Sequence, residues 1–429
     1  MSPERTDAVI IGAGAAGLAA GHRLAANGTS CIILEAHDVI GGRVHTLREP
    51  GWEIPIEIGA EFIHGNPDET WSIVRSAQLA TVEVPEDHET EDGGEPEPLD
   101  FDNVWDKITS RLAKLNHHDL SFAEFLRRDC TDLPEEARSQ AIGYVEGFEA
   151  ADPNIVSAIW LREAEQAAGA GGGAHRIRDG YSRIMDWLAS GRDVRLGRVV
   201  RQVRWSAGNV EAEAERADGA TEVYTARRAV ITLPVGVLQA PAGSQGAVRF
   251  APDTIEKRAI WQRLQVGPVV KLVLRFRTAF WRENGNPDLV FLHTPSSPIL
   301  TWWTARPSPA PILTGWSGGP AAAKLSRHST AQILDEALAT LQRTFSSTKV
   351  PVKTLLEAWH VFNWQADPYA RGAYCYVPAG GLDLPQRLAE PVAGTLFFAG
   401  EATHTQLMGT VAGAIASGYR AAEEVLASR

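Results

Sequence analysis

The chain has 429 residues, which exceeds the usual size of a single hydrophobic core and predicts two interlocked domains. A hydrophobic content of 44% and a charged content of 22% are those of an ordinary soluble globular protein. The net charge of −12 argues against broad nucleic-acid binding and is compatible with a cationic ligand.

The three cysteines, Cys31, Cys130 and Cys375, form no CxxC pair and have no spacing typical of metal ligands. We therefore expect no disulfide framework, no metal site and a reducing compartment. The first residues contain no apolar signal region, and no later stretch reaches transmembrane length. The sequence thus predicts a soluble, cytoplasmic protein without a membrane partner.

The first ordered stretch is an apolar strand, residues 8–11, that leads into Gly12-x-Gly14-x-x-Gly17 and a helical pattern of small residues. Gly12 allows the tight turn, Gly14 lets a pyrophosphate approach the backbone, and Gly17 lets helix and strand pack closely. The N–H groups of the first helical turn, with Ala15 and Ala16, then bind the phosphate charge.

Asn27-Gly28 is expected to close this helix, and the next apolar strand, residues 31–34, leads into Glu35 and Ala36. Because strand, glycines, helix, second strand and acid follow in order, the stretch predicts a dinucleotide site. Glu35 favours a free ribose 2′-hydroxyl, as in FAD or NAD, over NADP, and it does not choose between the first two.

Two short motifs follow, Gly41-Gly42-Arg43 and the segment GAEFIHG at residues 59–65. Arg43 is either a solvated loop charge or a ligand of a pyrophosphate oxygen. With these motifs the chain resembles the flavin amine oxidase family, which includes polyamine oxidases, monoamine oxidases and flavin-dependent histone lysine demethylases. The resemblance implies that Gly42 and Arg43 contact the FAD phosphates. It also implies that the segment comprising Gly59, Ala60, Glu61 and Phe62 runs along the isoalloxazine ring.

Residues 83–100 are rich in carboxylates and lack lysine and arginine, which favours a solvated loop; an electrostatic collar that attracts ammonium substrates is the alternative. Residues 101–168 have helical apolar spacing typical of packing, and Gly169 to Gly173 is a plausible hinge. Apolar spacing also predicts a packing helix over residues 330–345.

Residues 193–205 predict one alternating strand, and further strands are expected at 211–215 and 229–234. These segments look like parts of a glutathione-reductase-type FAD domain, and the resemblance places Val200 where the backbone meets the adenine. Lys271 interrupts an apolar strand at residues 267–276 and is either a snorkelling edge residue or functional. Family members carry a lysine here that holds a water against flavin N5, where a cation stabilises charge during reoxidation.

A second strong match covers residues 364–376. The resemblance implies that Trp364 and Tyr369 pack near the flavin and that Tyr374 forms one wall of an aromatic slot, where a cation–π contact contributes about 0.5–2 kcal/mol. Monoamine oxidases carry a flavin-linked cysteine where this chain has Ala373, which implies non-covalent FAD. Cys375, two residues away on the same predicted face, leaves the covalent alternative open.

The third match is a strand and glycine-spaced helix at residues 396–418, which offers helix-terminal N–H groups to the cofactor. Thr410 occupies the place where monoamine oxidases carry the second tyrosine of the slot. A threonine at this place is more similar to polyamine oxidases and histone demethylases. His64 matches a histidine that bonds a substrate nitrogen, or else is a structural histidine. The cofactor contacts implied here are Gly400, Glu401, Thr410, Val411 and Ala414.

Taken together, these patterns predict an α/β (α+β overall) protein with a Rossmann-type FAD domain over residues 1–75, 175–260 and 375–429. A mixed-sheet and helical substrate domain would cover residues 76–174 and 261–374. The resemblance implies FAD-dependent oxidation of a polyamine or other extended or secondary amine. Hydride passes from the α-carbon to flavin N5, the imine hydrolyses to an aldehyde, and O2 is reduced to hydrogen peroxide.

The expected partners are an amine and O2, in a monomer or homodimer. A monoamine oxidase and an L-amino-acid oxidase of the same fold are alternatives, although Phe62 occupies the place where amino-acid oxidases carry an arginine. A flavin-binding interaction protein without turnover is the alternative of another class.

Overall fold

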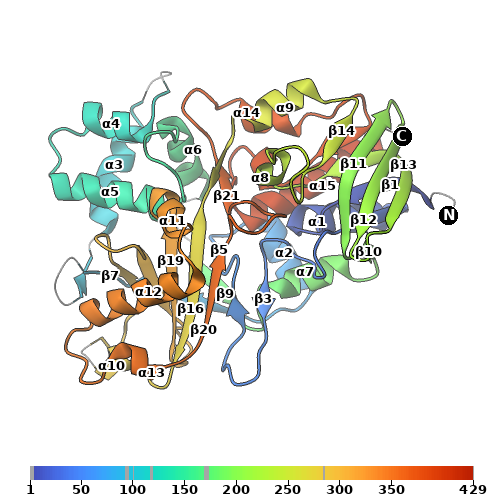
Figure 1. The fold of residues 1–429 in the computed structure, drawn as a ribbon. Coiled ribbons are helices and arrows are strands. Elements are labelled where there is room, and N and C mark those ends of the chain that lie inside the picture. Colours follow the sequence, from blue (N-terminus) through green and yellow to red (C-terminus); the bar gives the residue numbers. More distant parts are fainter. Residues whose placement is uncertain are drawn as a thin grey trace.

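Two large β-sheets, each assembled from distant parts of the sequence, organise the chain (Figure 1). The structure is a computed structural model that describes residues 4–91, 96–99, 101–115, 119–168, 173–283 and 286–428. In Figure 1 the first sheet lies on the right with both termini, the second sheet lies at lower left, and a group of helices lies at upper left.

The first sheet carries the glycine fingerprint at the end of its central strand. Its order is β10-β2-β1-β13-β12-β11-β14, and β22 also pairs with β13. The strands β10, β2, β1, β13 and β22 are parallel, as in a Rossmann-type layer, whereas β11, β12 and β13 are antiparallel. The bounds are β1 (Glu4–Ile11), β2 (Cys31–Leu34), β10 (Asp193–Arg195), β11 (Arg198–Ser206), β12 (Asn209–Arg216), β13 (Thr221–Ile231), β14 (Arg249–Ala251) and β22 (Leu396–Phe398).

Two helices, α1 (Ala15–Ala26) and α15 (Val411–Ala427), pack side by side against this sheet. A Cβ atom at Gly418 would lie 2.2 Å from the carbonyl oxygen of Ala16, so glycine is required for this approach. Asn27 is the C-cap of α1, which confirms the predicted helix end. The helices α2 (Asp68–Ser76) and α7 (Ser182–Ala189) lie next to α15 and α1.

The prediction of one strand over residues 193–205 is wrong. β10 ends at Arg195 and pairs in parallel with β2, while β11 begins at Arg198 and pairs with β12. Between them Gly197 adopts a φ of +63°, a left-handed conformation that turns the chain. The alternating pattern continues through this turn, so alternation alone did not reveal it.

The second sheet has the order β20-β16-β19-β18-β17-β7-β8. The acidic stretch supplies β7 and β8, so the prediction of a solvated loop over residues 83–100 is wrong for these segments; residues 92–95 and 100 lie outside the described residues. The bounds are β7 (His88–Thr90), β8 (Glu97–Pro98), β16 (Val269–Phe276), β17 (Phe291–His293), β18 (Thr301–Thr304), β19 (Ile312–Gly318) and β20 (Leu356–Asn363).

The predicted helical region contains α3 (Phe101–Leu112), α4 (Phe122–Asp129), α5 (Glu135–Gly147) and α6 (Ala158–Ala168), whose apolar faces join the main core. Most of the predicted hinge, residues 169–172, lies outside the described residues. The packing helix α12 (Thr330–Thr344) is confirmed, and it begins with a capping box of Ser329 and Gln332.

The remaining elements of the described residues are shorter. The helices are α8 (Val235–Leu238), α9 (Ile255–Trp261), α10 (Phe280–Glu283), α11 (Gly319–Leu325), α13 (Val352–Leu355), α14 (Leu384–Ala389) and the 3-10 turn η1 (Glu401–Thr403). The paired strands are β3 (Thr46–Leu47) with β4 (Ile56–Glu57), β9 (Ala174–Ile177) with β5 (Ile63–His64) and β6 (Thr81–Val84), and β15 (Gln265–Gly267) with β21 (Tyr374–Tyr376).

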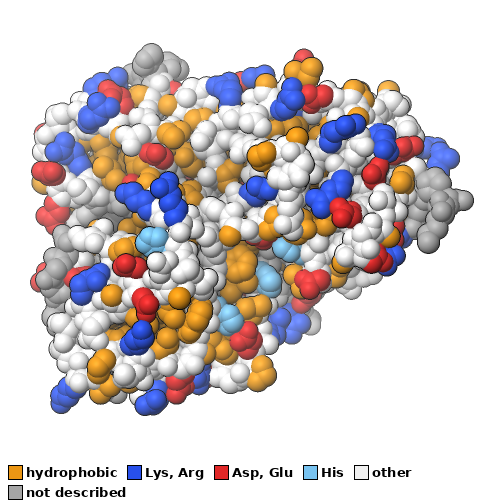
Figure 2. Space-filling view, in the orientation of Figure 1, with side chains coloured by type: hydrophobic (Ala, Val, Ile, Leu, Met, Phe, Trp, Pro, Cys, Tyr) orange, Lys and Arg blue, Asp and Glu red, His pale blue; other side chains and the backbone are white. Residues whose placement is uncertain are grey.

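The strands of the two large sheets fall within the segments predicted for the two domains, while the domain limits themselves stay a prediction. In the part of the chain that the structure describes, no helix is long and apolar enough to cross a membrane. Figure 2 shows hydrophobic side chains spread over one face and histidine side chains near its middle.

Candidate active site

The glycine fingerprint forms an open backbone cradle at the end of β1. A Cβ atom at Gly12 would lie 2.6 Å from Thr232 Oγ1, and one at Gly17 would lie 1.9 Å from the Gly12 carbonyl oxygen. At Gly14 the nearest atom is a backbone oxygen 3.9 Å away, which leaves the helix start open. These residues fit a pyrophosphate at the N-terminus of α1, where Ala15 and Ala16 begin the helix.

Glu35 lies at the end of β2 and is almost fully buried. Its oxygens accept hydrogen bonds from the backbone N–H groups of Ala13 (2.7 Å) and His37 (2.9 Å). Burial raises the pKa of Glu35, and these hydrogen bonds offset only part of that effect. A carboxylate oxygen has a further lone pair, so Glu35, followed by Ala36, fits a ribose hydroxyl.

Tyr369 and Val200, two predicted cofactor residues, belong to the nucleotide end of the site. The Tyr369 ring lies 4.9 Å from that of His37, whose Nε2 is 3.2 Å from Asp367 Oδ2, so the structure places Tyr369 near Glu35. Val200 is buried beside a register shift in β11, between Val200 and Gln202. A bulge of this kind can re-aim the backbone toward a ligand.

Arg43 and Glu401 make hydrogen bonds to several segments in the middle of the site. Arg43 Nη1 donates to Glu401 Oε1 (3.0 Å) and to the Ala373 carbonyl (2.6 Å). Glu401, which is buried, also accepts from the backbone N–H groups of Cys375 and Gly409. Arg43 Nε and Nη2 make no hydrogen bond within the described residues, so they fit a phosphate oxygen.

A small cavity lies beside this pair. Its lining includes Arg43, residues 231–235 at the end of β13, and residues 398–403 at the end of β22. Ligands of open parallel sheets bind at such carboxyl ends of strands. Gly400 fits this place because its φ is +127° and a Cβ there would meet no atom within 4 Å.

The segment from Ile58 to Phe62 crosses from Arg43 to the second sheet. Its backbone bonds to Arg43, since Ala60 N–H donates to the Arg43 carbonyl (3.0 Å). A Cβ at Gly59 would lie 2.0 Å from that carbonyl oxygen. Lys271 Nζ donates to the Gly59 carbonyl (3.1 Å), and Trp364 Nε1 donates to the Ile58 carbonyl (3.2 Å). The structure therefore brings Arg43, Lys271 and Trp364 around one segment.

Lys271 is 1% exposed and lies on β16, between β20 and β19, which excludes the snorkelling edge lysine. Its Nζ is 2.8 Å from Glu61 Oε2. Burial alone would raise the pKa of Glu61, but the charges of Lys271 and Arg176 and their hydrogen bonds outweigh burial and lower it to about 2. Lys271 and Glu61 therefore form a buried ion pair.

Beyond this pair lies a set of contacting rings, which we call the aromatic wall: Phe62, His64, Tyr144, Phe148 and Trp303. The His64 ring lies 5.7 Å from that of Phe62 and 5.6 Å from that of Phe148. His64 is exposed to solvent, yet desolvation by surrounding protein lowers its pKa to about 4. The imidazole of His64 is therefore neutral near pH 7.

Tyr374 extends this wall toward the first sheet. Its hydroxyl donates to the Phe148 carbonyl (2.5 Å), and a Cβ at Gly409 would lie 3.3 Å from its ring. Thr410, the next residue, caps α15: its hydroxyl accepts from Gly413 N–H (2.9 Å) and donates to the Leu407 carbonyl (2.8 Å). Thr410 thus fixes the start of the helix that carries Val411 and Ala414.

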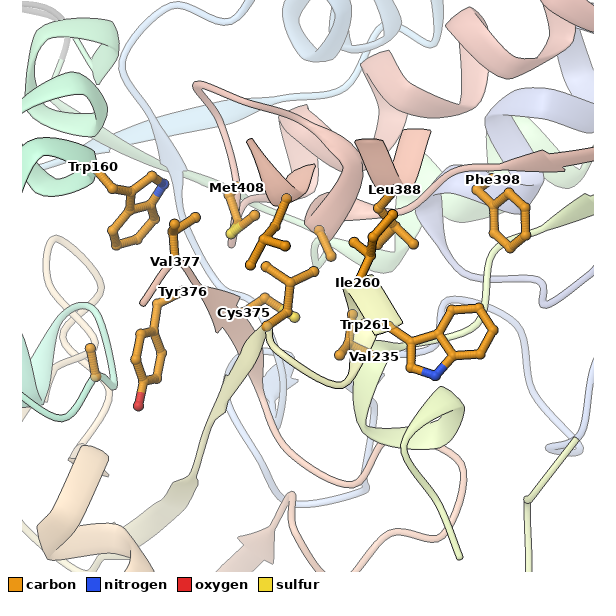
Figure 3. Packing of buried hydrophobic residues seen from close by; sticks show 14 of the residues in the cluster. Trp160, Val235, Ile260, Trp261, Cys375, Tyr376, Val377, Leu388, Phe398 and Met408 are labelled. Atoms are coloured by element: carbon orange, nitrogen blue, oxygen red, sulfur yellow. The ribbon is translucent and has the colours of Figure 1, made fainter. Parts of the chain in front are cut away.

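Ala373 and Cys375 lie in different apolar clusters. Ala373 packs with Trp364, whereas Cys375 lies among residues that include Val235 and Met408 (Figure 3). Burial raises the pKa of the Cys375 thiol well above its usual value. The expectation that the two side chains share a face is not supported by this packing.

Sequence reasoning missed three side chains of this region. Arg176 pairs with Glu61, the Trp303 indole donates to Glu61, and Glu149 follows α5 beside Phe148. Burial, and then the charge of Glu165, raise the pKa of Glu149 to about 8, and it has no hydrogen-bond partner among the described residues. Neither Arg176 nor Glu149 stands in a motif, so no local signal identified them.

The sequence matches the family model described as flavin containing amine oxidoreductase over residues 15–134 and 118–426. It is 28% identical to polyamine oxidase 3 of Oryza sativa subsp. japonica, over 97% of this chain and 88% of that protein. It is also 28% identical to lysine-specific histone demethylase 2 of Homo sapiens, over 98% of this chain and 53% of that protein.

Two solved structures confirm the predicted two-domain amine oxidase fold. A putrescine oxidase with redesigned cofactor binding has a TM-score of 0.84 and 21% identity, over 100% of both chains. Cyclohexylamine oxidase from Brevibacterium oxydans IH-35A has a TM-score of 0.81 and 23% identity, over 98% of both chains. With the family match, these findings confirm a flavin cofactor and an oxidoreductase that acts on amine donors. The chain belongs to the flavin-containing amine oxidoreductase family.

Proposed function

We propose that the chain oxidises a polyamine or another extended or secondary amine, with FAD held non-covalently and O2 as acceptor. The observation that carries this proposal is the Glu149 carboxyl, which has no hydrogen-bond partner among the described residues and whose charge acts on Tyr144 and Tyr374 of the aromatic region. A carboxylate and aromatic faces both favour ammonium groups. A substrate with a second cationic nitrogen would satisfy Glu149 while its reacting carbon lies near Tyr374 and Lys271.

The residues that would hold FAD are the fingerprint backbone, Glu35 and Arg43, with residues 59–62, Lys271 and Trp364 beside the ring. When bound, FAD would accept a hydride from the carbon next to the amine nitrogen. O2 would then reoxidise the flavin and be reduced to hydrogen peroxide. The aromatic wall orients the amine and excludes water. Neutral His64 accepts a hydrogen bond from a substrate nitrogen. An amine that arrives neutral reacts without a protein base.

The amino-acid oxidase alternative requires a cation for the substrate carboxylate. Arg176 lies 4.8 Å over the Phe62 ring, but its nitrogens donate to Glu61 and to the carbonyls of Arg306 and Thr304. Each nitrogen of this guanidinium already donates a hydrogen bond within the protein, which weighs against an amino-acid substrate. A monoamine would leave Glu149 without a cationic partner.

Anaerobic flavin bleaching tests the proposal. The panel contains spermine, spermidine, N-acetylated polyamines, putrescine, benzylamine, phenylethylamine and several L-amino acids. We expect bleaching by polyamines, reversed by air with formation of peroxide. Bleaching by benzylamine or by amino acids alone would contradict the proposed substrate class.

Replacement of Glu149 by glutamine should weaken binding of a diamine or polyamine about tenfold, equivalent to about 1.4 kcal/mol, and leave benzylamine binding unchanged. Because the pKa of Glu149 is about 8, the carboxyl ionises as the pH rises. Polyamine affinity of the native enzyme should therefore increase from pH 7 to pH 9, and this increase should be absent in Glu149→Gln. Stopped-flow reduction over this pH range measures both effects.

The matched control is Glu146→Gln, which removes a half-buried carboxyl of α5 three residues away. If both substitutions weaken polyamine binding equally, Glu149 acts only through the overall negative charge of this region and not as a specific partner of the substrate.

Acid precipitation of the holoenzyme should release all of the yellow colour into the supernatant, because Ala373 replaces the flavin-linked cysteine and Cys375 lies in a different apolar cluster from Ala373. Absorbance of supernatant and pellet measures the released fraction. Colour retained in the pellet, and lost from it in Cys375→Ser, would show a covalent bond instead.

A further inference from the structure

Glu61 joins two buried cations at the end of the aromatic wall. Lys271 Nζ lies 2.8 Å from Glu61 Oε2, and Arg176 Nε lies 2.8 Å from Glu61 Oε1. The indole N–H of Trp303 is 3.1 Å from both oxygens. The side chains of Lys271, Glu61 and Arg176 are only 1%, 10% and 12% exposed. Three charges thus share a region from which water is largely excluded.

Each side-chain nitrogen of Arg176, Lys271 and Trp303 donates at least one hydrogen bond. Arg176 also donates to the carbonyls of Thr304 and Arg306, so its guanidinium is fixed on both sides. Lys271 has three N–H bonds, of which two are directed to Glu61 and to the Gly59 carbonyl. No acceptor for the third N–H occurs among the described residues. Glu61 and Gly59 therefore fix the direction in which Lys271 presents its remaining proton.

The cluster also has a defined charge. Lys271 and Arg176 contribute two positive charges and Glu61 one negative charge, so the net charge is positive by one. Because Glu61 has a pKa of about 2, it keeps its charge throughout the neutral range. Charges in such a poorly solvated region interact far more strongly than in water. Counting these three side chains, loss of Glu61 gives a net charge of plus two, and loss of Arg176 gives a net charge of zero.

We propose that Glu61 is a positioning residue that directs Lys271 toward the flavin ring and, together with Arg176, sets the positive charge felt by the flavin. The inference rests on the proposed place of the flavin beside Lys271 and does not depend on which amine is oxidised. Extra positive charge favours the reduced flavin because reduction adds electrons. Glu61 and Arg176 should therefore change the flavin reduction potential in opposite directions.

The test compares Glu61→Gln, Arg176→Gln and the double variant as holoenzymes, by anaerobic equilibration with a redox dye. In Glu61→Gln the ratio of reduced to oxidised flavin at a given dye potential should rise about tenfold, which is about 30 mV for a two-electron couple. In Arg176→Gln the ratio should fall by a similar factor. The double variant restores a net charge of plus one and should stay within about threefold of the native protein.

Arg275→Gln is the control, since this arginine lies on the same strand as Lys271 but pairs with Glu53 and Glu357 near the surface. It should leave the potential unchanged. Glu61→Asp keeps the negative charge and should also remain near the native value. If Glu61→Gln does not fold, the flavin potentials of Arg176→Gln and Glu61→Asp still test the inference.

Equal shifts in the same direction for Glu61→Gln and Arg176→Gln, or no shift with flavin bound, would overturn the inference. The measurement uses no substrate. A failed amine panel would therefore contradict the proposed substrate class without altering this result.

Discussion

Replacement of Lys271 by methionine is expected to slow the reaction of the reduced flavin with O2 by about 100- to 1,000-fold. Methionine keeps most of the buried volume but removes the cation 3.1 Å from the Gly59 carbonyl and 2.8 Å from Glu61. Glu61 keeps its bonds to Arg176 and Trp303, so the fold should persist. Stopped-flow measurements of anaerobic reduction and of reoxidation separate the two half-reactions.

The control is Lys257→Met. This second buried lysine donates to the carbonyls of Arg387 and Leu388 in α14, so its loss should lower the melting temperature without slowing reoxidation. Unchanged reduction and reoxidation rates in Lys271→Met would show that Lys271 has no role at the flavin.

Replacement of Gly17 by alanine is expected to abolish flavin binding. The new Cβ would lie 1.9 Å from the Gly12 carbonyl oxygen and 3.0 Å from Thr232 Oγ1. Because the first clash involves backbone, the start of α1 must move away from β1, at a cost of about 3 kcal/mol or more. The flavin-to-protein absorbance ratio after purification measures the loss.

Gly21→Ala, in the same helix, is the matched control. Its Cβ would meet the terminal methyl group of Ile33 at 2.6 Å, and a side-chain end can move at low cost. This variant should retain its flavin. Full flavin occupancy in Gly17→Ala would contradict the proposed cradle.

The sequence identified the nucleotide end of the site because its physics is local. Gly12, Gly14 and Gly17 follow one strand within a few residues, and each is required by a turn or a close approach. Glu35 ends the next strand. Lys271 was singled out through the family resemblance, since pattern alone also allowed an edge residue. The structure excludes that edge residue by placing β16 between two neighbours.

Other residues had no local signal. Glu149 stands in no motif. It is related to the site only because it follows Phe148, whose carbonyl accepts a hydrogen bond from Tyr374, a residue far along the chain. The acidic stretch looked like a solvated loop because charges and prolines lower strand propensity. Part of it forms β7 because its backbone pairs in parallel with β17, about 200 residues later.

The sequence by itself therefore determined the Rossmann-type layer, the flavin amine oxidase motifs and the ends of elements such as β2 and α1. These depend on neighbours along the chain, through turn geometry, hydrophobic period and helix caps. Only the tertiary structure decided that Glu61 pairs with both Lys271 and Arg176, which are 210 and 115 residues away. Such a pairing follows from how two sheets and a crossing segment meet in space, and no short-range pattern encodes it.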